Sequence, residues 1–181
     1  VPGLFAAGTA RAMEPGVYAG GFALMTTSVT GYLAGERVAR FLEEEAPVAI
    51  QIEESALSEL EKKLFAPLGR DGLTPKEVLT HIQEAMFPYN VSVLKTEAAL
   101  HNALQRIKTI QVSEIPRMGA KDPHYLLKLR EVQGIAFISE LYLRASLERK
   151  ESRAGHYRED YPYRDDAYFG WLTLQQDENS Q

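Results

Sequence analysis

Arginines, acids and tyrosines alternate densely near the end of the sequence, between Glu148 and Asp166. This run holds five Lys or Arg and six Asp or Glu, so its charges nearly cancel, and tyrosines and Pro162 stand between them. An arginine can donate two parallel hydrogen bonds to one carboxylate, and tyrosine rings bury apolar surface. The composition fits either a solvated polar tail or a segment that arginine–carboxylate pairs fasten across a domain face.

A second pattern that could form a ligand-binding site lies in the first 45 residues. A short apolar run, Leu4 to Ala7, ends at Gly8 and predicts a buried strand of an α/β sheet. A glycine-containing loop follows, and Phe22 to Glu45 has the periodicity of a helix. Backbone N–H groups at such a turn and at a helix start attract electron-rich ligand atoms, such as those of a flavin's isoalloxazine ring. The same pattern also occurs as a simple glycine-rich connection in α/β proteins.

From about residue 46 the sequence changes to charged amphipathic segments joined by short turns, which predicts an antiparallel bundle of about three long helices. The capping box Thr74-Pro75-Lys76-Glu77 begins a helix that we expect to reach Phe87. Apolar spacing predicts further helices over 53–66, 93–112 and 123–150, with Lys95 facing water. The last helix should be buried on two sides, because it carries two apolar stripes. The stripes are Leu129, Val132, Ala136 and Leu143, and Ile135, Ile138, Tyr142 and Ala145.

Composition argues against several classes of function. The net charge of −5 is spread along the chain, whereas nucleic-acid-binding proteins cluster Lys and Arg on one face. Without cysteine the chain can build no disulfide, thiolate zinc site or iron–sulfur cluster, and this lack agrees with the reducing cytoplasm. The histidines have no partner at ligand spacing, and no apolar run approaches the roughly 20 residues that span a bilayer. We therefore expect no metal site, no nucleic-acid partner and no membrane span. We expect a cytoplasmic protein that reaches a membrane only through a partner.

Both ends of the chain resemble one family. Pro2-Gly3-Leu4-Phe5-Ala6-Ala7-Gly8 looks like the closing strand of the flavin domain in flavoprotein subunits related to succinate dehydrogenase, fumarate reductase and adenylylsulfate reductase. Gly20-Gly21, leading into Gly31 and Gly35, resembles the helix beneath the flavin. The run from Arg149 to Asp166, followed by Trp171-Leu172, resembles the segment that closes the helical domain of these proteins.

This resemblance implies a mainly α fold in two parts. The range 46–181 would be an antiparallel helical bundle, the C-terminal domain of the family, and 1–45 the strand–turn–helix remnant of an α/β FAD-binding domain. Thr9 stands where the family usually has an acidic residue, and its hydroxyl can take part of that role. The nucleotide-binding first strand and its glycine turn are missing from the sequence, which looks truncated, so we expect the chain alone not to retain FAD. The residues that the resemblance implies at the FAD site are Gly8, Thr9, Ala23 and Leu24.

Two functions are compatible with these residues. The first is an FAD-dependent oxidoreductase subunit that contacts the rest of its FAD domain and exchanges electrons between a small-molecule substrate and an iron–sulfur partner. Its catalytic residues are unknown: Glu14 and Tyr18 stand where dicarboxylate-reducing members carry His and Arg, and only Arg11 could replace that arginine. The second is a non-catalytic helical module that docks an electron-transfer subunit.

Overall fold

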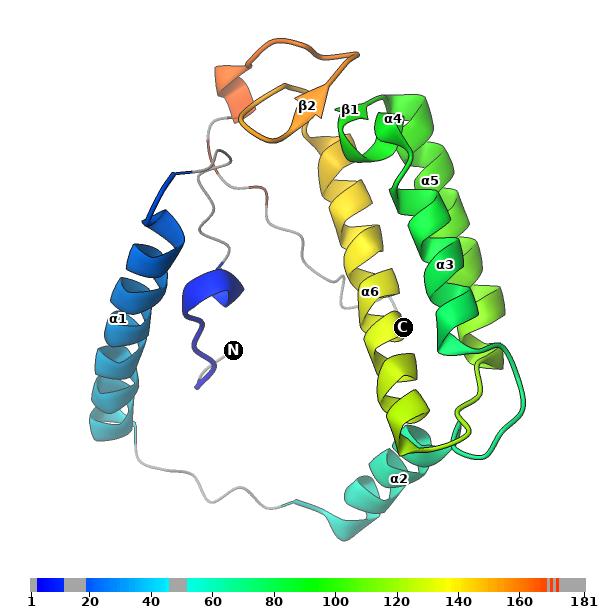
Figure 1. Cartoon of the computed structure of the whole chain (residues 1–181). Helices are drawn as coiled ribbons and strands as arrows, with labels where there is room; N and C mark the ends of the chain where they lie inside the picture. The colour runs from blue at the N-terminus through cyan, green and yellow to red at the C-terminus, as the bar shows by residue number, and fades with distance from the viewer. Residues whose placement is uncertain (1–2, 12–18, 46–51, 169, 171, 173–181) are drawn as a thin grey trace. The chain divides into compact units, whose positions relative to one another are not determined.

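The computed structural model describes residues 3–11, 19–45, 52–168, 170 and 172 (Figure 1). Its mainly helical architecture confirms the expected fold class. The chain divides into two compact units, Val1–Glu53 and Glu54–Gln181. The expected domain boundary near residue 46 lies outside the described residues.

The first unit contains the 3₁₀ turn η1, Gly8–Arg11, and the helix α1, Phe22–Glu44, which confirms the helix expected from Phe22 to Glu45. The segment from Leu4 to Ala7 was expected to be a strand, but it has no hydrogen-bonded neighbour among the described residues and is not one. A strand exists only where a second strand pairs with it. Instead the segment is held by Phe5, whose ring packs edge-on against Phe41 of α1 at 5.8 Å between centroids.

The second unit is a helical bundle built on α3, Pro75–Met86, α5, Glu97–Thr109, and α6, Pro123–Glu148. Figure 1 shows these three helices side by side, with α5 running antiparallel to the other two. The shorter elements are α2, Glu54–Phe65, α4, Tyr89–Ser92, the π-helical turn η2, Ile110–Glu114, and the 3₁₀ turns η3, Ile115–Arg117, and η4, Asp166–Tyr168. The core consists of apolar side chains from all three long helices, among them Val78, Ile82, Leu100, Ile107, Leu129 and Leu143.

Local signals in the sequence set the helix starts of the bundle. The capping box predicted at Thr74 is present: its hydroxyl accepts the N–H of Glu77 at 3.2 Å, and the Glu77 carboxylate accepts the N–H of Thr74 at 2.7 Å. Asp122 caps α6 by accepting the N–H of Tyr125 at 3.0 Å. No helix within the described ranges is long and apolar enough to cross a bilayer.

The expected helix over 93–112 begins later than the sequence indicated. Leu94–Lys95 forms the strand β1, and Thr96 is the N-cap of α5. β1 pairs in parallel with β2, Tyr157–Arg158, so that Lys95 lies opposite Arg158. Lys95 is therefore 2% exposed, and the prediction that it faces water was wrong. The cause is a pairing with a segment far along the chain, which helical periodicity cannot report.

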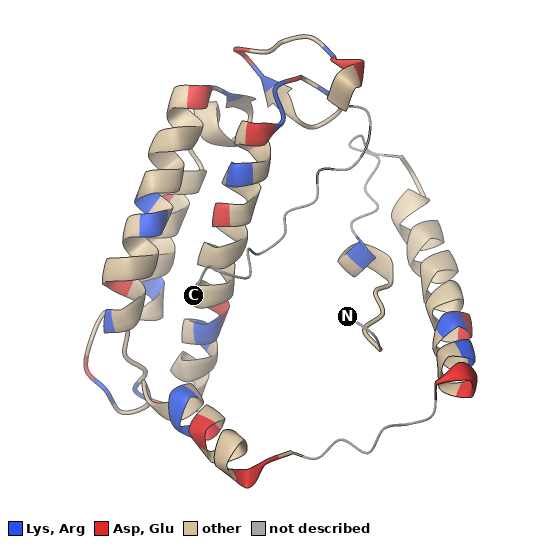
Figure 2. Cartoon of the chain, turned by 180° about the vertical axis from the view of Figure 1, so that it is seen from behind, with Lys and Arg blue, Asp and Glu red and all other residues tan. Residues whose placement is uncertain are grey.

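The two stripes of α6 have different environments within the second unit. The stripe with Leu129 and Leu143 is buried in the core, as expected. The other is not: Ile138 is 61% exposed and Tyr142 41%. Burial on two sides is thus corrected to burial on one side. Figure 2 shows charged residues at intervals along α6, and none of the four residues of the exposed stripe is charged.

Close backbone contact joins the loops at the opposite end of the bundle from β1. A Cβ on Gly72 would lie 2.1 Å from the carbonyl oxygen of Arg117, and a Cβ on Gly119 would lie 2.0 Å from that of Arg70. Only glycine can occupy either position without moving the backbone. The contact is fixed by the hydrogen bond from the N–H of Leu73 to the carbonyl of Arg117 at 3.0 Å.

Candidate functional site

The residues predicted at the flavin site lie in η1 and in the first turn of α1. Gly8 is buried with φ of 59°, a left-handed conformation that favours glycine. Its N–H donates to the hydroxyl of Thr30 at 2.8 Å, and a side chain in its place would meet Thr27 at 3.5 Å. Gly8 therefore packs against α1 one to two turns after Ala23. The next residue, Thr9, is exposed.

The N-terminus of α1 is open. Gly21, with φ of 79°, precedes the helix without a side-chain cap, and a Cβ on Gly20 or Gly21 would meet nothing within 4 Å. Ala23 and Leu24 are exposed. N–H groups in the first turn of a helix have no intrahelical acceptor, and those of Ala23 and Leu24 have none elsewhere among the described residues. Two donors at the positive end of a helix thus remain available to an electron-rich group.

A single arginine in the tail after α6 joins the ends of two helices. Arg158 is fully buried and donates to both carboxylate oxygens of Asp160, at 2.7 and 2.8 Å. It also donates to the carbonyl of Ser146 in the last turn of α6, at 2.7 Å. Asp160 in turn accepts the N–H of Glu97, the first residue of α5, at 2.8 Å. The pair therefore caps the C-terminus of α6 with a cation and the N-terminus of α5 with an anion, as the helix dipoles favour.

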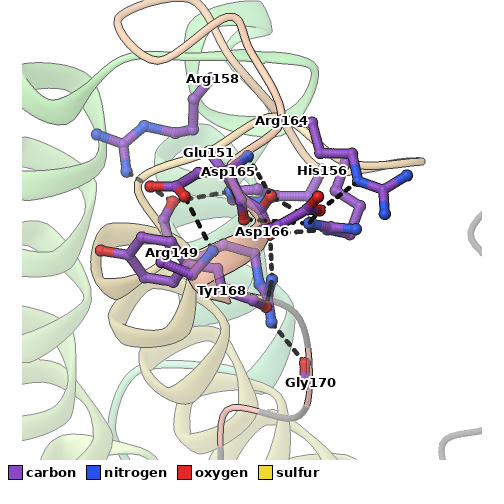
Figure 3. A network of polar contacts seen from close by, with 11 residues as sticks. Arg149, Glu151, His156, Arg158, Arg164, Asp165, Asp166, Tyr168 and Gly170 are labelled. Carbon is purple, nitrogen blue, oxygen red and sulfur yellow. Dashed lines mark hydrogen bonds and ion pairs between the residues drawn. The ribbon is translucent and has the colours of Figure 1, made fainter.

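A buried carboxylate organises the rest of the tail (Figure 3). Glu151 is fully buried, accepts from Arg153 at 2.9 Å, forms an ion pair with Arg149 and accepts the N–H of Asp165 at 3.0 Å. The hydrogen bond from Arg153, supported by Asp165 and Arg149, lowers the pKa of Glu151 to about 2. Arg149 continues to the carbonyls of Tyr168 and Gly170, at 3.0 and 3.1 Å. Of the two interpretations of this segment, the structure thus shows the fastened one, at the end of the bundle rather than across its side.

The sequence identified the tail as a unit but missed its partners. Lys95 and Glu97 lie far from the tail in sequence, and nothing in their local pattern marks them. Within the described part of the chain no cluster of His, Asp and Glu could hold a metal ion.

The exposed stripe of α6 borders an apolar hollow. The hollow has a volume of about 650 Å³ and lies between α6 and the C-terminal end of α3. Its apolar walls are contributed by Met86, Phe87, Ile135, Ile138 and Tyr142. Exposed apolar surface of this kind is typical of a contact with another domain or protein.

A family model and two relatives that match most of the chain point to the same family. The family model of the fumarate reductase flavoprotein C-terminal region matches residues 80–181. Over 88% of the chain, 32% of residues are identical to one subunit of the CoM/CoB fumarate reductase of Methanothermobacter marburgensis. Over 93%, 29% are identical to the flavoprotein subunit of the 8-methylmenaquinol:fumarate reductase of Wolinella succinogenes. The chain covers 29% of the length of each of these relatives.

Solved structures agree with the sequence matches. Adenylylsulfate reductase from Archaeoglobus fulgidus superimposes with a TM-score of 0.71 at 25% identity, over 82% of this chain and 26% of that one. Fold and matches together define a class, the C-terminal region of large flavoprotein subunits. Within that class, the chain belongs to the family of fumarate reductase and succinate dehydrogenase flavoprotein subunits.

Proposed function

We propose that this chain is the C-terminal part of an FAD-dependent oxidoreductase subunit that passes electrons between a small-molecule substrate and an iron–sulfur partner. The family membership supports this role, and relatives of the chain are named as fumarate reductase and succinate dehydrogenase flavoprotein subunits. When bound, FAD supplies the redox chemistry. The chain's own residues supply one wall of the cofactor site and the helical domain that follows it in the sequence.

The observation that carries the proposal is the open N-terminus of α1. The N–H groups of Ala23 and Leu24 are the donors that we assign to the flavin ring, where negative charge gathers on reduction. Gly8 lets the preceding segment approach α1, and we assign the side chain of Thr9, an exposed residue, to the sugar-like chain of the cofactor. These residues fit the edge of a flavin, because donors are present without a side chain that would obstruct the approach at Gly20 and Gly21.

The rest of the FAD domain is the partner that we assign to α1. The N-terminal half of this helix, up to Gly35, has no charged residue. Within it Leu24 and Tyr32 are 75% and 74% exposed, and Met25 and Val29 are more than half exposed. Such a surface is stable in water only when another part of the protein covers it. Because one wall of the site cannot hold the cofactor, the 181-residue chain by itself is expected to be colourless.

The second function, a docking module for an electron-transfer subunit, is favoured by the apolar hollow beside α6. The two functions differ in one simple property. A flavoprotein subunit is yellow when purified at full length, whereas a pure docking module is colourless at every length. We place the intact subunit in the cytoplasm, in accord with the absence of cysteine from these 181 residues, with any membrane contact made through a partner.

The test introduces a negative charge at the proposed flavin contact. Leu24→Asp in the full-length flavoprotein keeps α1 folded, because an acid in the first turn suits the helix dipole. The new carboxylate repels the reduced flavin, so the reduction potential falls by roughly 30 mV for each 1.4 kcal/mol of repulsion. Tyr32→Asp is the matched control: Tyr32 is as exposed as Leu24 in the 181-residue chain, and the variant adds the same charge two turns further along α1. Equal reduction potentials in the two variants would show that the start of α1 does not contact the flavin.

A further inference from the structure

Two hollows on the exposed side of α6 meet at Tyr142. The larger one is the apolar hollow of about 650 Å³, and Tyr142 lines the end of it that is nearest to the C-terminus of α6. The smaller one has a volume of about 380 Å³, and Tyr142 lines it together with Ala145 and Leu172. Leu172 is the last described residue of the chain, and it therefore lies close to the rim of the apolar hollow.

The described chain approaches Tyr142 in the direction opposite to that of α6. Arg149, the residue after this helix, donates to the carbonyl of Gly170 at 3.1 Å (Figure 3). Leu172, two residues further, lines its hollow with Ala145 and Tyr142, which precede Arg149 by one and two helical turns. From Gly170 to Leu172 the chain thus runs antiparallel to α6, along its exposed stripe.

The spacing of the next leucine matches the spacing of the stripe. Leu174 follows Leu172 by two residues, so in an extended chain the two side chains point to the same side, about 6.6 Å apart. Ile138 precedes Tyr142 by four residues, which is about 6 Å along a helix. A chain that continues in the same direction therefore brings Leu174 to Ile138, inside the apolar hollow.

Tethering favours the chain's own segment over a separate molecule as the occupant of the apolar hollow. Because Leu172 lies at the rim, Leu174 is held near the hollow at an effective concentration that a free partner matches only in roughly the millimolar range. The walls at this end suit a leucine, since Ile138, Ser139 and Tyr142 carry no charge. Ile138 is 61% exposed in the described part of the chain, so an apolar side chain has surface to cover there.

We propose that residues 172–174 lie along α6 and close the Tyr142 end of the apolar hollow, with the side chain of Leu174 against Ile138. The inference is independent of FAD and of the proposed function, because every residue that carries it belongs to the second unit. It bears instead on the alternative function. An electron-transfer subunit can dock on this part of α6 only after Leu174 has left the hollow.

Disulfide formation tests the contact in the 181-residue chain, which has no cysteine of its own. The double variant Ile138→Cys with Leu174→Cys should form an intramolecular disulfide on mild oxidation at low protein concentration, because docking brings the two Cβ atoms within bonding reach. Two control pairs change one position each. Phe137→Cys with Leu174→Cys uses a similarly exposed neighbour on another side of α6, and Ile138→Cys with Thr173→Cys uses the neighbour that an extended segment turns away.

Mass spectrometry and thiol counting follow the three pairs. Both control pairs should form the disulfide about tenfold more slowly than the pair at positions 138 and 174, because their Cβ atoms point apart. Equal rates for the three pairs, or no intramolecular disulfide between positions 138 and 174, would overturn the proposal. A disulfide between two chains would assign the hollow to a second copy and would also overturn it.

Access to the apolar hollow gives a second test without cysteine. Nile red, an uncharged dye that fluoresces on apolar surface, should show about twofold stronger fluorescence with Leu174→Asp than with the wild-type chain, because a carboxylate does not stay against an apolar wall. Thr173→Asp adds the same charge on the other side of the segment and should leave the fluorescence unchanged. Equal fluorescence in the two variants would contradict the closure of the hollow by Leu174.

Discussion

Arg158, together with Asp160, links the end of α6 to the start of α5. Its replacement by methionine is the sharpest test of that role. The guanidinium is fully buried and makes three short hydrogen bonds, two to Asp160 and one to the carbonyl of Ser146. Methionine has a similar length and fills most of the space. The variant therefore removes the charge and the donors while it leaves little cavity.

The expected cost follows from the groups left behind. Removing one member of a buried ion pair costs about 3 to 5 kcal/mol of unfolding free energy, because the other charge stays without a partner. Asp160 keeps its bond to the N–H of Glu97, and its side chain is 29% exposed, so water can solvate it in part. The lower end of the range applies, and we expect Arg158→Met to lose about 3 kcal/mol.

Urea unfolding followed by circular dichroism measures this quantity, and the tail contains its own control. Arg164 pairs with Asp166, but their side chains are 60% and 76% exposed, so Arg164→Met should cost under about 1 kcal/mol. The double variant Arg158→Met with Asp160→Asn should lose about 2 kcal/mol less unfolding free energy than the sum of the losses in the two single variants. Equal costs for Arg158→Met and Arg164→Met would refute the assignment of Arg158 as the clamp between α5 and α6.

Two other residues give predictions with clear signs. The pKa of Glu151 is lowered from 4.5 to about 2, so its ionised form stabilises the fold above pH 4.5, and this contribution is lost as the pH falls toward 2. Urea unfolding at stepped pH should therefore show that the free energy of unfolding falls more steeply with decreasing pH in the wild type than in Glu151→Gln. Parallel pH dependences would contradict the pairing of Glu151 with the arginines. Gly72→Ala should lower the free energy of unfolding by over about 2 kcal/mol, because the new Cβ would lie 2.1 Å from a carbonyl oxygen. Gly134→Ala, where the new Cβ meets nothing within 4 Å, should instead gain up to about 1 kcal/mol, and equal effects in urea unfolding would contradict the close contact.

Features set by local sequence could be predicted, and features set by distant pairings could not. Helical periodicity and the capping box at Thr74 gave α1, α3 and α6 with their ends close to those observed. The alternation of charges in the tail indicated arginine–carboxylate pairing, but it did not distinguish Arg158 from Arg153. Only the structure shows that Arg158 is fully buried whereas the side chain of Arg153 is 24% exposed. Burial depends on which elements meet, and the sequence does not state this directly.

The candidate flavin residues differ from these features, because local sequence patterns did not predict them. Gly8, Thr9, Ala23 and Leu24 came from a resemblance, and their role stays a prediction. The geometry adds a physical reason for two of them, since the N–H groups of Ala23 and Leu24 are open at the start of α1. The burial of Lys95 had no usable local signal, because β1 is two residues long and its partner strand begins at Tyr157.

The bond between Asp160 and the N–H of Glu97 joins residues 63 positions apart, and this separation has a consequence for synthesis of the protein. On the ribosome α5 emerges well before the segment that caps it, and α6 emerges before Arg158. Contacts between distant positions form late, since a long loop must close first. A chain that stops after Glu148 would contain α3, α5 and α6 but not the segment that links the start of α5 to the end of α6. A nonsense mutation in this short tail should therefore expose the whole bundle to proteases and chaperones, although every core residue has already been made.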